Sequence, residues 1–306
     1  MSCGPRAEVV ADMDDFDWLD RLDLFKWALL AAVSAGLVLP LIGTQLLLRR
    51  TSFQAIALPQ FASVGMIAGY AVLPWWIETF GLGGLTVDQA LEDPHAGTNW
   101  HLAWAALAVF MGLYGLVRAG RRGQPSLEPV RVAAAFAVAS ALSYVLGRLS
   151  PVGRGHVDEL LLGELLGVGV HEFETIAVGL FVVAAVFAWT RHDLLACAFD
   201  PEGAQVLGKP VRRWEVCHQA LVGVAVSIAT LVVGPVLVFG LLVLPPLAAR
   251  PWAHSMDRFY GLSAALGLLA VLLGSVASFE LDLPLAPAMV AAAALFVVPL
   301  AFVKRT

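Results

Sequence analysis

Apolar stretches of about twenty residues recur along almost the whole chain, from Phe25 to the residues just before Lys304. A helix of that length crosses the hydrocarbon core of a bilayer. The composition agrees, because 59% of the residues are hydrophobic, 14% are charged, and the mean hydropathy is +0.80. These values lie far from those of a soluble domain. Because the backbone in lipid must satisfy its own hydrogen bonds, we predict an all-α polytopic membrane protein.

The apolar runs predict about nine transmembrane segments, with eight as the alternative. The count depends on 216–249, which is too long for one span and is expected to form two short spans hinged at Gly234-Pro235. The second span is expected to break near Pro59. The predicted spans cover 25–48, 53–76, 101–117, 130–149, 173–190, two segments within 216–249, 259–279, and a last segment that ends at Lys304.

Positive charge is distributed unevenly between the predicted loops. Most of the 19 Lys and Arg residues fall on one side of the membrane in this span order, and the positive-inside rule makes that side cytoplasmic. The chain is therefore expected in a bacterial inner membrane, with its N-terminus outside and its C-terminus in the cytoplasm. Residues 1–24 form an acidic extracytoplasmic segment, and 25–306 form the transmembrane domain. The stretch 150–172 is too polar and Gly-rich for a span, which favours an interfacial or re-entrant helix.

A polar island over 191–213 interrupts the apolar second half of the chain. A short helix is expected inside it, because Asp200 can cap the N-terminus, a proline follows, and Glu202 lies in the first turn, where the helix dipole favours an anion. Gly208 is expected to end this helix. Because basic residues flank this short helix, we expect it to lie in a cytoplasmic loop to which a soluble partner could bind.

Ionisable and polar groups near the membrane are the candidates for a transport path. Those between two predicted spans carry imidazole and carboxylate ligands, which suit Zn, Mn or Fe, although each alone could be a solvated interfacial residue. Within the second span, small neighbours allow close helix packing, so that its polar residues could face the path or form an interhelical hydrogen bond. The candidates are His156, Asp158 and Glu164 between the spans, Gln60 and Ser63 in the second span, and Asp282 in an outer turn.

Five segments carry a resemblance to a known family. LPLIGTQLLLRRTSFQAIALPQFASVGMIAG resembles the opening of the zinc, manganese and iron type of metal-ion ABC transporter permease, in which a Gly precedes an Arg-Arg pair and a small-residue helix. The segments HVDELLLGELLGV, DPEGAQVLG, GPVLVFGLLVLPPLAAR and SFELDLPLAPAMV are similar to later motifs of that family and occur in the same order. The resemblance covers about residues 36–300.

The resemblance implies a permease that dimerises, receives a metal ion from an extracytoplasmic binding protein, and is driven by a separate ATPase. It implies that the ATPase docks on the loop that contains Asp200, Glu202, Ala204 and Gly208. Acidic positions of the family's motifs are matched by Asp158, Glu164 and Asp282, the second being Glu where Asp is more usual. Gln60 stands where the family usually has His, and Gln is a poorer ligand for transition metals.

The function expected from these features is the permease subunit of an ABC importer for a divalent transition-metal ion, with zinc or manganese first and iron as a further candidate. The ion is cargo, no cofactor is expected to stay bound, ATP hydrolysis belongs to a partner chain, and no nucleic acid is a partner. The alternative is a self-contained secondary cation transporter, which should carry paired carboxylates in mid-span and often an inverted repeat. An intramembrane enzyme is excluded because no Ser/His or His-Glu-x-x-His constellation lies inside a span.

Overall fold

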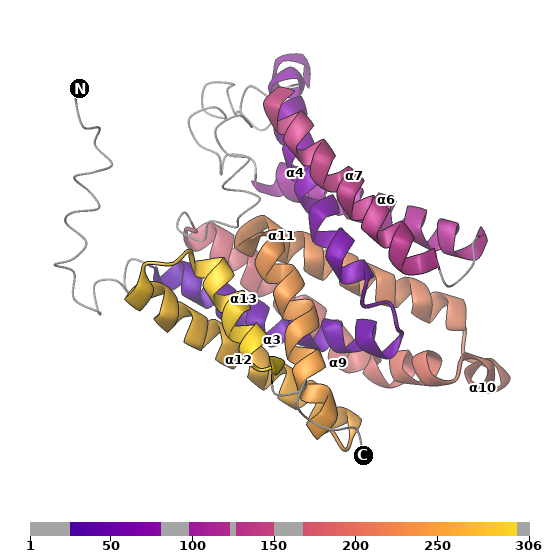
Figure 1. Ribbon diagram of the computed structural model, residues 1–306. Coiled ribbons are helices and arrows are strands. Elements are labelled where there is room, and N and C mark those ends of the chain that lie inside the picture. The colour runs from indigo at the N-terminus through magenta and orange to yellow at the C-terminus, as the bar shows by residue number, and fades with distance from the viewer. Residues whose placement is uncertain (1–24, 81–97, 123–126, 150–167, 299–306) are drawn as a thin grey trace, which may run out of the picture.

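The computed structural model describes residues 25–80, 98–122, 127–149 and 168–298, and within these ranges it contains helices and no strands (Figure 1). Seven of the described helices are long and apolar enough to cross a membrane. The helices are α3 (Lys26–Leu48), α4 (Gln54–Phe80), α6 (Thr98–Arg122), α7 (Glu128–Leu149), α9 (Val170–Phe199), α10 (Pro201–Val206), α11 (Val211–Ala249), η5 (Arg250–Trp252), α12 (Met256–Leu281) and α13 (Leu285–Leu295). The prediction of an all-α polytopic membrane protein is confirmed.

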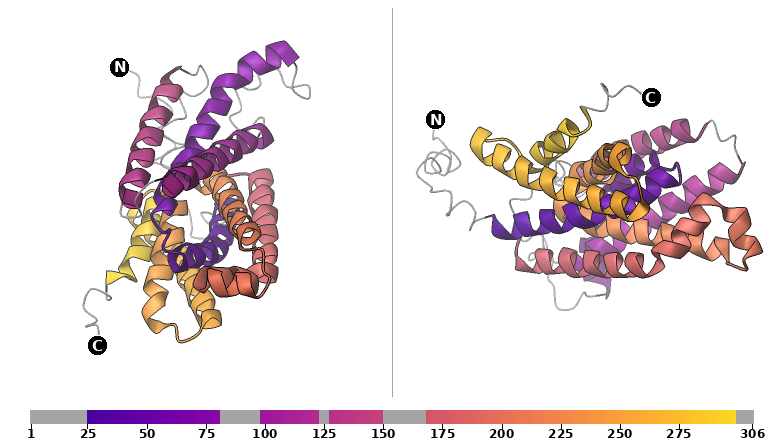
Figure 2. Two further views of the ribbon diagram at one scale, coloured as in Figure 1. Left: turned by 90° about the vertical axis from the view of Figure 1, so that its right-hand side faces the viewer. Right: turned by 90° about the horizontal axis from the view of Figure 1, so that it is seen from below.

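The long helices form two groups around α11. One group consists of α3, α9, α12 and α13, and the other consists of α4 with α6 and α7 packed on it (Figures 1 and 2). In the most apolar window of α11, 78% of the residues are buried, against 17% in α6 and 22% in α7. The apolar faces of α6 and α7 that remain exposed are those expected of helices surrounded by lipid.

The chain of α11 is bent at Gly234. Its φ of 79° and ψ of 162° are not helical, and Pro235 follows directly. Glycine adopts such a positive φ without the steric cost that a Cβ would bring. Proline cannot donate a backbone hydrogen bond, so the helix ladder is also interrupted at this point. The hinge predicted at Gly234-Pro235 is therefore confirmed, and it divides α11 into a first leg over 211–233 and a second leg over 235–249.

The two legs run in opposite directions. Helices α3 and α9 lie side by side and run the same way (Figure 1). Gly179, near the start of α9, faces Ile228 near the end of the first leg, so this leg is antiparallel to α9. Gly43, near the end of α3, faces Leu242 in the second leg, so this leg is parallel to α3. Counting the legs separately gives eight long segments in the described ranges, and α13 forms part of the predicted last span.

Two predicted boundaries are wrong. Helix α4 continues through Pro59 without a break, because Pro59 lies in its second turn and the neighbouring helices α6, α7 and α11 pack against it. Helix α9 does not end at residue 190 but runs on to Phe199, so the polar island begins as helix. The extension buries Leu194 and Cys197. Its polar face carries two ion pairs, in which Arg191 contacts Asp257 of α12 at 2.8 Å and Asp193 contacts Lys209 at 2.6 Å.

Candidate functional site

The short helix α10 is built as its sequence predicts. Asp200 is the N-cap, and its Oδ1 accepts a hydrogen bond of 2.8 Å from the Gly203 N–H. Pro201 occupies the first helical position, and Glu202 lies exposed in the first turn. Gly208 adopts a φ of 76° just beyond the end of the helix, where the chain turns back. The predicted cap, first turn and stop are all found at these positions.

The two faces of α10 differ in burial. Ala204 is 3% exposed and anchors the helix to the rest of the chain. Val206 is 88% exposed and Leu207 is 77% exposed, so an apolar tip projects from the loop beside the carboxylate of Glu202. Apolar surface that is exposed and contiguous is a feature of sites that contact other proteins. Sequence reasoning missed this pair, although two adjacent large apolar residues before Gly208 could have indicated it.

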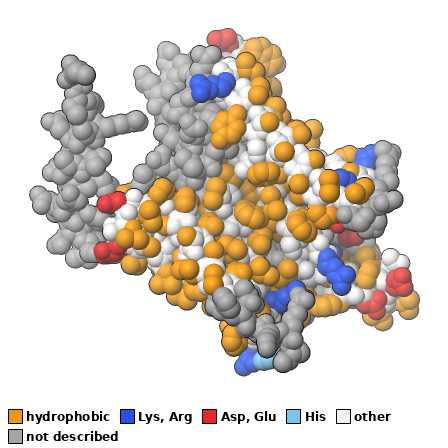
Figure 3. Space-filling view, viewed as in Figure 1, with side chains coloured by type: hydrophobic (Ala, Val, Ile, Leu, Met, Phe, Trp, Pro, Cys, Tyr) orange, Lys and Arg blue, Asp and Glu red, His pale blue; other side chains and the backbone are white. Residues whose placement is uncertain are grey.

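The loop is fastened to the helices beside it. Lys209 Nζ lies 2.6 Å from Asp193 Oδ1, which ties the segment after α10 back to α9. The Lys209 N–H donates to the Ala204 carbonyl at 2.9 Å, which closes the turn around Gly208. Figure 3 shows that hydrophobic side chains cover most of the described surface on this face, with charged side chains gathered toward the ends of the helices. The loop that contains α10 therefore projects from the apolar helices and is fixed in place by its contacts with α9.

The two candidates on α4 have different surroundings. Ser63 is fully buried, and its Oγ donates to the Pro59 carbonyl of the same helix at 3.1 Å. Gln60 is partly buried, and its Oε1 is shielded from solvent without a hydrogen-bond partner among the described residues. An unpaired buried oxygen is costly, so this atom is available to a water or a cation. The Ser63 hydroxyl, in contrast, already donates a hydrogen bond within α4.

The remaining path candidates do not form a cluster in the described ranges. Asp282 is exposed in the left-handed turn that ends α12, with a φ of 50°. Helix α12 packs on α3, α11 and α13, whereas α4 packs on α6, α7 and α11, so Asp282 and Gln60 belong to different groups of helices. His156, Asp158 and Glu164 lie outside the described residues, as does the 1–24 segment. No group of three or more His, Cys, Asp or Glu residues that could hold a metal occurs in the described part of the chain.

The end of the predicted helix over 150–172 is described, and it belongs to α9. Glu172 lies in the first turn of α9, where its Oε2 accepts a 3.0 Å hydrogen bond from the Gly169 N–H. The side chain therefore caps the start of α9, which is a structural role.

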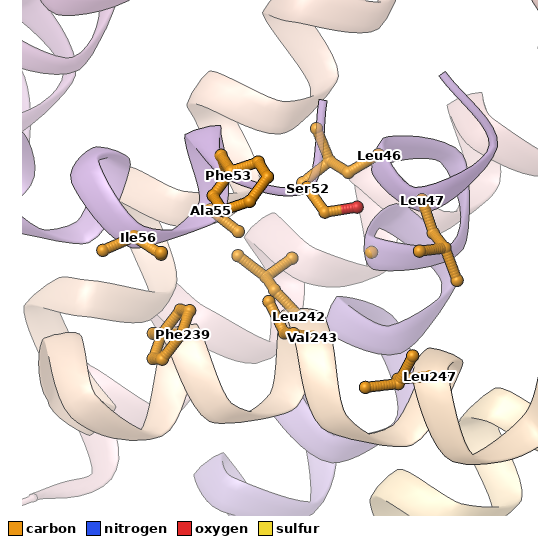
Figure 4. A pocket seen from close by; sticks show the side chains of 11 residues that line it. Leu46, Leu47, Ser52, Phe53, Ala55, Ile56, Phe239, Leu242, Val243 and Leu247 are labelled. Atoms are coloured by element: carbon orange, nitrogen blue, oxygen red, sulfur yellow. The ribbon is translucent and has the colours of Figure 1, made fainter. Parts of the chain in front are cut away.

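An apolar hollow of about 230 Å³ lies between the end of α3, the start of α4 and the second leg of α11 (Figure 4). Its lining offers one polar side chain, Ser52, and no group that would bind a metal ion. The hollow therefore does not have the chemistry of a metal path. The lining residues are Gly43, Leu46, Leu47, Ser52, Phe53, Ala55, Ile56, Phe239, Leu242, Val243 and Leu247.

Comparison with solved structures places the fold. The chain is similar to the structure described as PsaBC from Streptococcus pneumoniae in complex with Fab, with a TM-score of 0.72, 19% identity, and coverage of 96% of this chain and 94% of that one. A second structure, described as an inward-facing conformation of a putative metal-chelate type ABC transporter, has a TM-score of 0.66 at 14% identity and covers 94% of this chain and 90% of that one. At these identities the likeness concerns the fold.

Curated relatives carry names from metal transport. The chelated iron transport system membrane protein YfeD of Yersinia pestis is 28% identical over 47% of this chain and 48% of its own length, so the match spans about half of that relative. The manganese import system permease protein ScaB of Streptococcus parasanguinis is 25% identical over 92% of this chain and 90% of its own length. The model of the ABC 3 transport family matches residues 96–304, which include α6 to α13 with the capped α10 and the Gly234 hinge. With a match over that range, this multi-pass membrane protein belongs to the ABC 3 transport family.

Proposed function

We propose that this chain is the permease subunit of an ABC importer for a divalent transition-metal ion, zinc or manganese first and iron as a further candidate. The observation that carries the proposal is α10, a capped helix with an exposed apolar tip that projects from a body of membrane-crossing helices. A separate ATPase docks there, on the surface that includes Glu202, Val206 and Leu207, while Asp200 and Gly208 shape the loop and Ala204 anchors it. The ATPase binds on the cytoplasmic side of a bacterial inner membrane. The N-terminus, with residues 1–24, lies outside and the C-terminus lies inside.

Transport follows from two arrangements of the same helices. Two copies of the chain, each crossing the bilayer over 25–306, enclose the path. A binding protein delivers the ion from outside. Closure of the partner ATPases on ATP displaces α10 and exposes the path to one side and then to the other. In this proposal the chain provides the path for the ion and the docking surface on α10, and the partner chain hydrolyses ATP.

The ion meets oxygen and imidazole ligands along the proposed path. His156, Asp158, Glu164 and Asp282 offer carboxylate and imidazole groups at the outer mouth, a ligand set that suits these metals. Gln60 contributes a neutral oxygen further in, which is supported by its buried and unpaired Oε1. In this proposal Ser63 supports α4 at Pro59 and does not contact the ion, since its hydroxyl is bonded within the helix.

The Gln60→Ala substitution is expected to raise the KM for metal uptake by about three- to tenfold, since it removes one neutral contact to the passing ion. Metal uptake by the reconstituted permease and ATPase is the measurement. Ser63→Ala, one helical turn further along α4, is the matched control and should change the KM by less than about twofold, because its hydroxyl bonds its own helix. Equal effects of the two substitutions would contradict the place given to Gln60.

The function itself is tested by ATP hydrolysis. The chain is co-expressed with its neighbouring ATPase and placed in nanodiscs, and hydrolysis is measured with the binding protein loaded with zinc, manganese or iron. We expect the loaded binding protein to raise the hydrolysis rate several-fold for one of these metals. We also expect Glu202→Arg to prevent the ATPase from co-purifying, because it reverses the charge at the exposed first turn of α10.

The rival transporter makes the opposite prediction. If the chain alone moves cations into liposomes without any ATPase, and Glu202→Arg has no effect on that flux, the ABC-permease proposal is wrong. A secondary transporter would draw on an ion gradient, so flux should then depend on membrane potential or pH rather than on ATP.

A further inference from the structure

Arg49 follows the last residue of α3 and begins the tight turn that leads into α4. Its N–H donates to the Gln45 carbonyl at 3.0 Å, and the Thr51 N–H donates to the Leu46 carbonyl at 2.9 Å. Arg50 adopts a left-handed φ of 59°, which completes the reversal before α4 begins at Gln54. The turn is thus closely bonded to the end of α3, and its movement would carry the start of α4 with it.

The Arg49 side chain points away from this turn and across to α9. Its Nη2 donates a 3.2 Å hydrogen bond to the Leu194 carbonyl. Its Nε is shielded from solvent and has no hydrogen-bond partner in the part of the chain that the structure describes. Burial lowers the pKa of the guanidinium, and the negative charge of Glu215 opposes that shift. Moving the guanidinium away from Leu194 would leave a partly buried charge without this hydrogen bond, so its position is constrained.

The groups around Arg49 flank α10 on both sides. Leu194 and Cys197 lie one turn apart near the end of α9, the helix that enters α10. Glu215 and His218 lie one turn apart at the start of α11, the helix that leaves it, and the negative charge of Glu215 acts on the Arg49 guanidinium. The Arg49 guanidinium is therefore hydrogen-bonded to the end of α9 and lies within the electrostatic influence of Glu215 at the start of α11. Because Lys209 also ties the loop to α9, a displacement of α10 must move these ends.

The turn also borders a space that no side chain fills. The apolar hollow is lined by Leu46 and Leu47 before the two arginines and by Ser52 and Phe53 after them (Figure 4). Across the hollow lies the second leg of α11. A well-packed interface would resist movement, whereas a void leaves the turn room to shift toward that leg. The turn is thus hydrogen-bonded to α9 through Arg49 and borders an unfilled hollow, next to the close contact of Gly43 with Leu242 in the second leg.

We propose that Arg49 is a positioning residue that transmits the movement of α10 to the α3–α4 turn, and through it to α4 and Gln60. This inference rests on the proposed function and assigns a route by which the ATPase acts on the path. Arg50 provides the matched comparison, because it is the adjacent arginine in the same turn but its side chain is exposed. A coupling role should belong to Arg49 alone, whereas a simple need for cytoplasmic positive charge would be shared by both.

The test uses the permease with its ATPase in nanodiscs or liposomes, supplied with the metal-loaded binding protein. Three quantities are measured for each variant: co-purification of the ATPase, the rate of ATP hydrolysis, and the metal taken up per ATP hydrolysed. We expect Arg49→Gln to bind the ATPase and hydrolyse ATP, with metal uptake per ATP reduced about tenfold, as the loss of a charge-assisted hydrogen bond implies. Arg49→Lys should give an intermediate ratio, because it keeps the charge without the planar fork. Arg50→Gln should stay within about twofold of the wild type.

Unchanged metal uptake per ATP in Arg49→Gln would overturn the inference, and so would equal losses in Arg49→Gln and Arg50→Gln. If Arg49→Gln does not assemble, Arg49→Lys decides, and a ratio equal to that of the wild type would overturn the inference. Failure of the proposed function has a different signature, because the wild-type chain itself would then neither bind the ATPase nor respond to the loaded binding protein. A wild type that is coupled normally separates the two.

Discussion

Gly267→Ala is expected to destabilise the protein by about 3 kcal/mol or more, at the upper end of the cost of overpacking a close contact. A Cβ at residue 267 would lie 2.2 Å from the Gly36 carbonyl oxygen and 2.6 Å from Pro40 Cγ, so α12 could not approach α3 as it does. The obstacle is backbone and a proline ring, and neither can rotate away. In detergent, the midpoint of thermal unfolding should fall by about 5–10 °C, or the variant should not be recovered as a single species.

Gly261→Ala is the control on the same helix. In the described part of the chain, nothing beyond the helix's own backbone and the two neighbouring residues lies within 4 Å of the Cβ that this change adds. The variant should therefore unfold at the wild-type temperature or slightly above it, because Ala favours helix over Gly. Equal losses of stability in the two variants would mean that helix flexibility, and not the approach of α3 to α12, explains the effect. The pair thus separates packing from helix propensity.

The features that sequence reasoning predicted correctly depend on local chemistry. The apolar runs gave the long helices, the Gly234-Pro235 dipeptide gave the hinge, and Asp200 with Gly208 gave the bounds of α10. Each depends on the solvent around a segment or on the backbone preference of one or two residues. Such signals are complete in the sequence, since no distant residue is needed to interpret them.

The features that it missed depend on partners far away in the chain. Helix α9 continues past residue 190, where it buries Leu194 against the core and pairs Asp193 with Lys209, and no local pattern identifies such distant partners. The hydrogen bond from Arg49 to Leu194 joins residues that are 145 positions apart in the sequence. Hydropathy treats each residue alone, so it recognises a polar residue as costly in the membrane but cannot say which group satisfies it.

The candidate path was only partly predictable for the same reason. The sequence predicts the same choice for both residues, the path or an interhelical hydrogen bond. The structure separates Ser63, whose hydroxyl is bonded within its own helix, from Gln60, whose buried oxygen has no partner among the described residues. In the loop that contains α10, Ala204 is buried, whereas Val206 and Leu207 are exposed and accessible to a partner. The acidic and imidazole candidates at 156–164 lie outside the described residues and remain a prediction.

Gly208→Val is expected to weaken binding of the partner ATPase by about tenfold or more. The φ of 76° at this position costs a residue with a Cβ about 1–2 kcal/mol, and a β-branched residue more, so the turn after α10 would open. Opening it breaks the hydrogen bond from the Lys209 N–H to the Ala204 carbonyl and releases the Lys209–Asp193 pair. Titration of the purified ATPase onto nanodiscs that contain the variant measures the change.

Gly208→Asn decides whether the backbone or the added bulk is responsible. Asn is close to Val in size but tolerates the left-handed region, so its affinity for the ATPase should stay within about threefold of the wild type. Apart from the two adjacent residues, no described atom lies within 4 Å of a Cβ at this position, so the Cβ that either substitution adds meets no clash there. Equal losses with Val and Asn would place residue 208 at the contact itself, and an unchanged affinity with both would remove α10 from the docking surface. A loss with Val alone means that the ATPase recognises the shape that Gly208 gives to the loop.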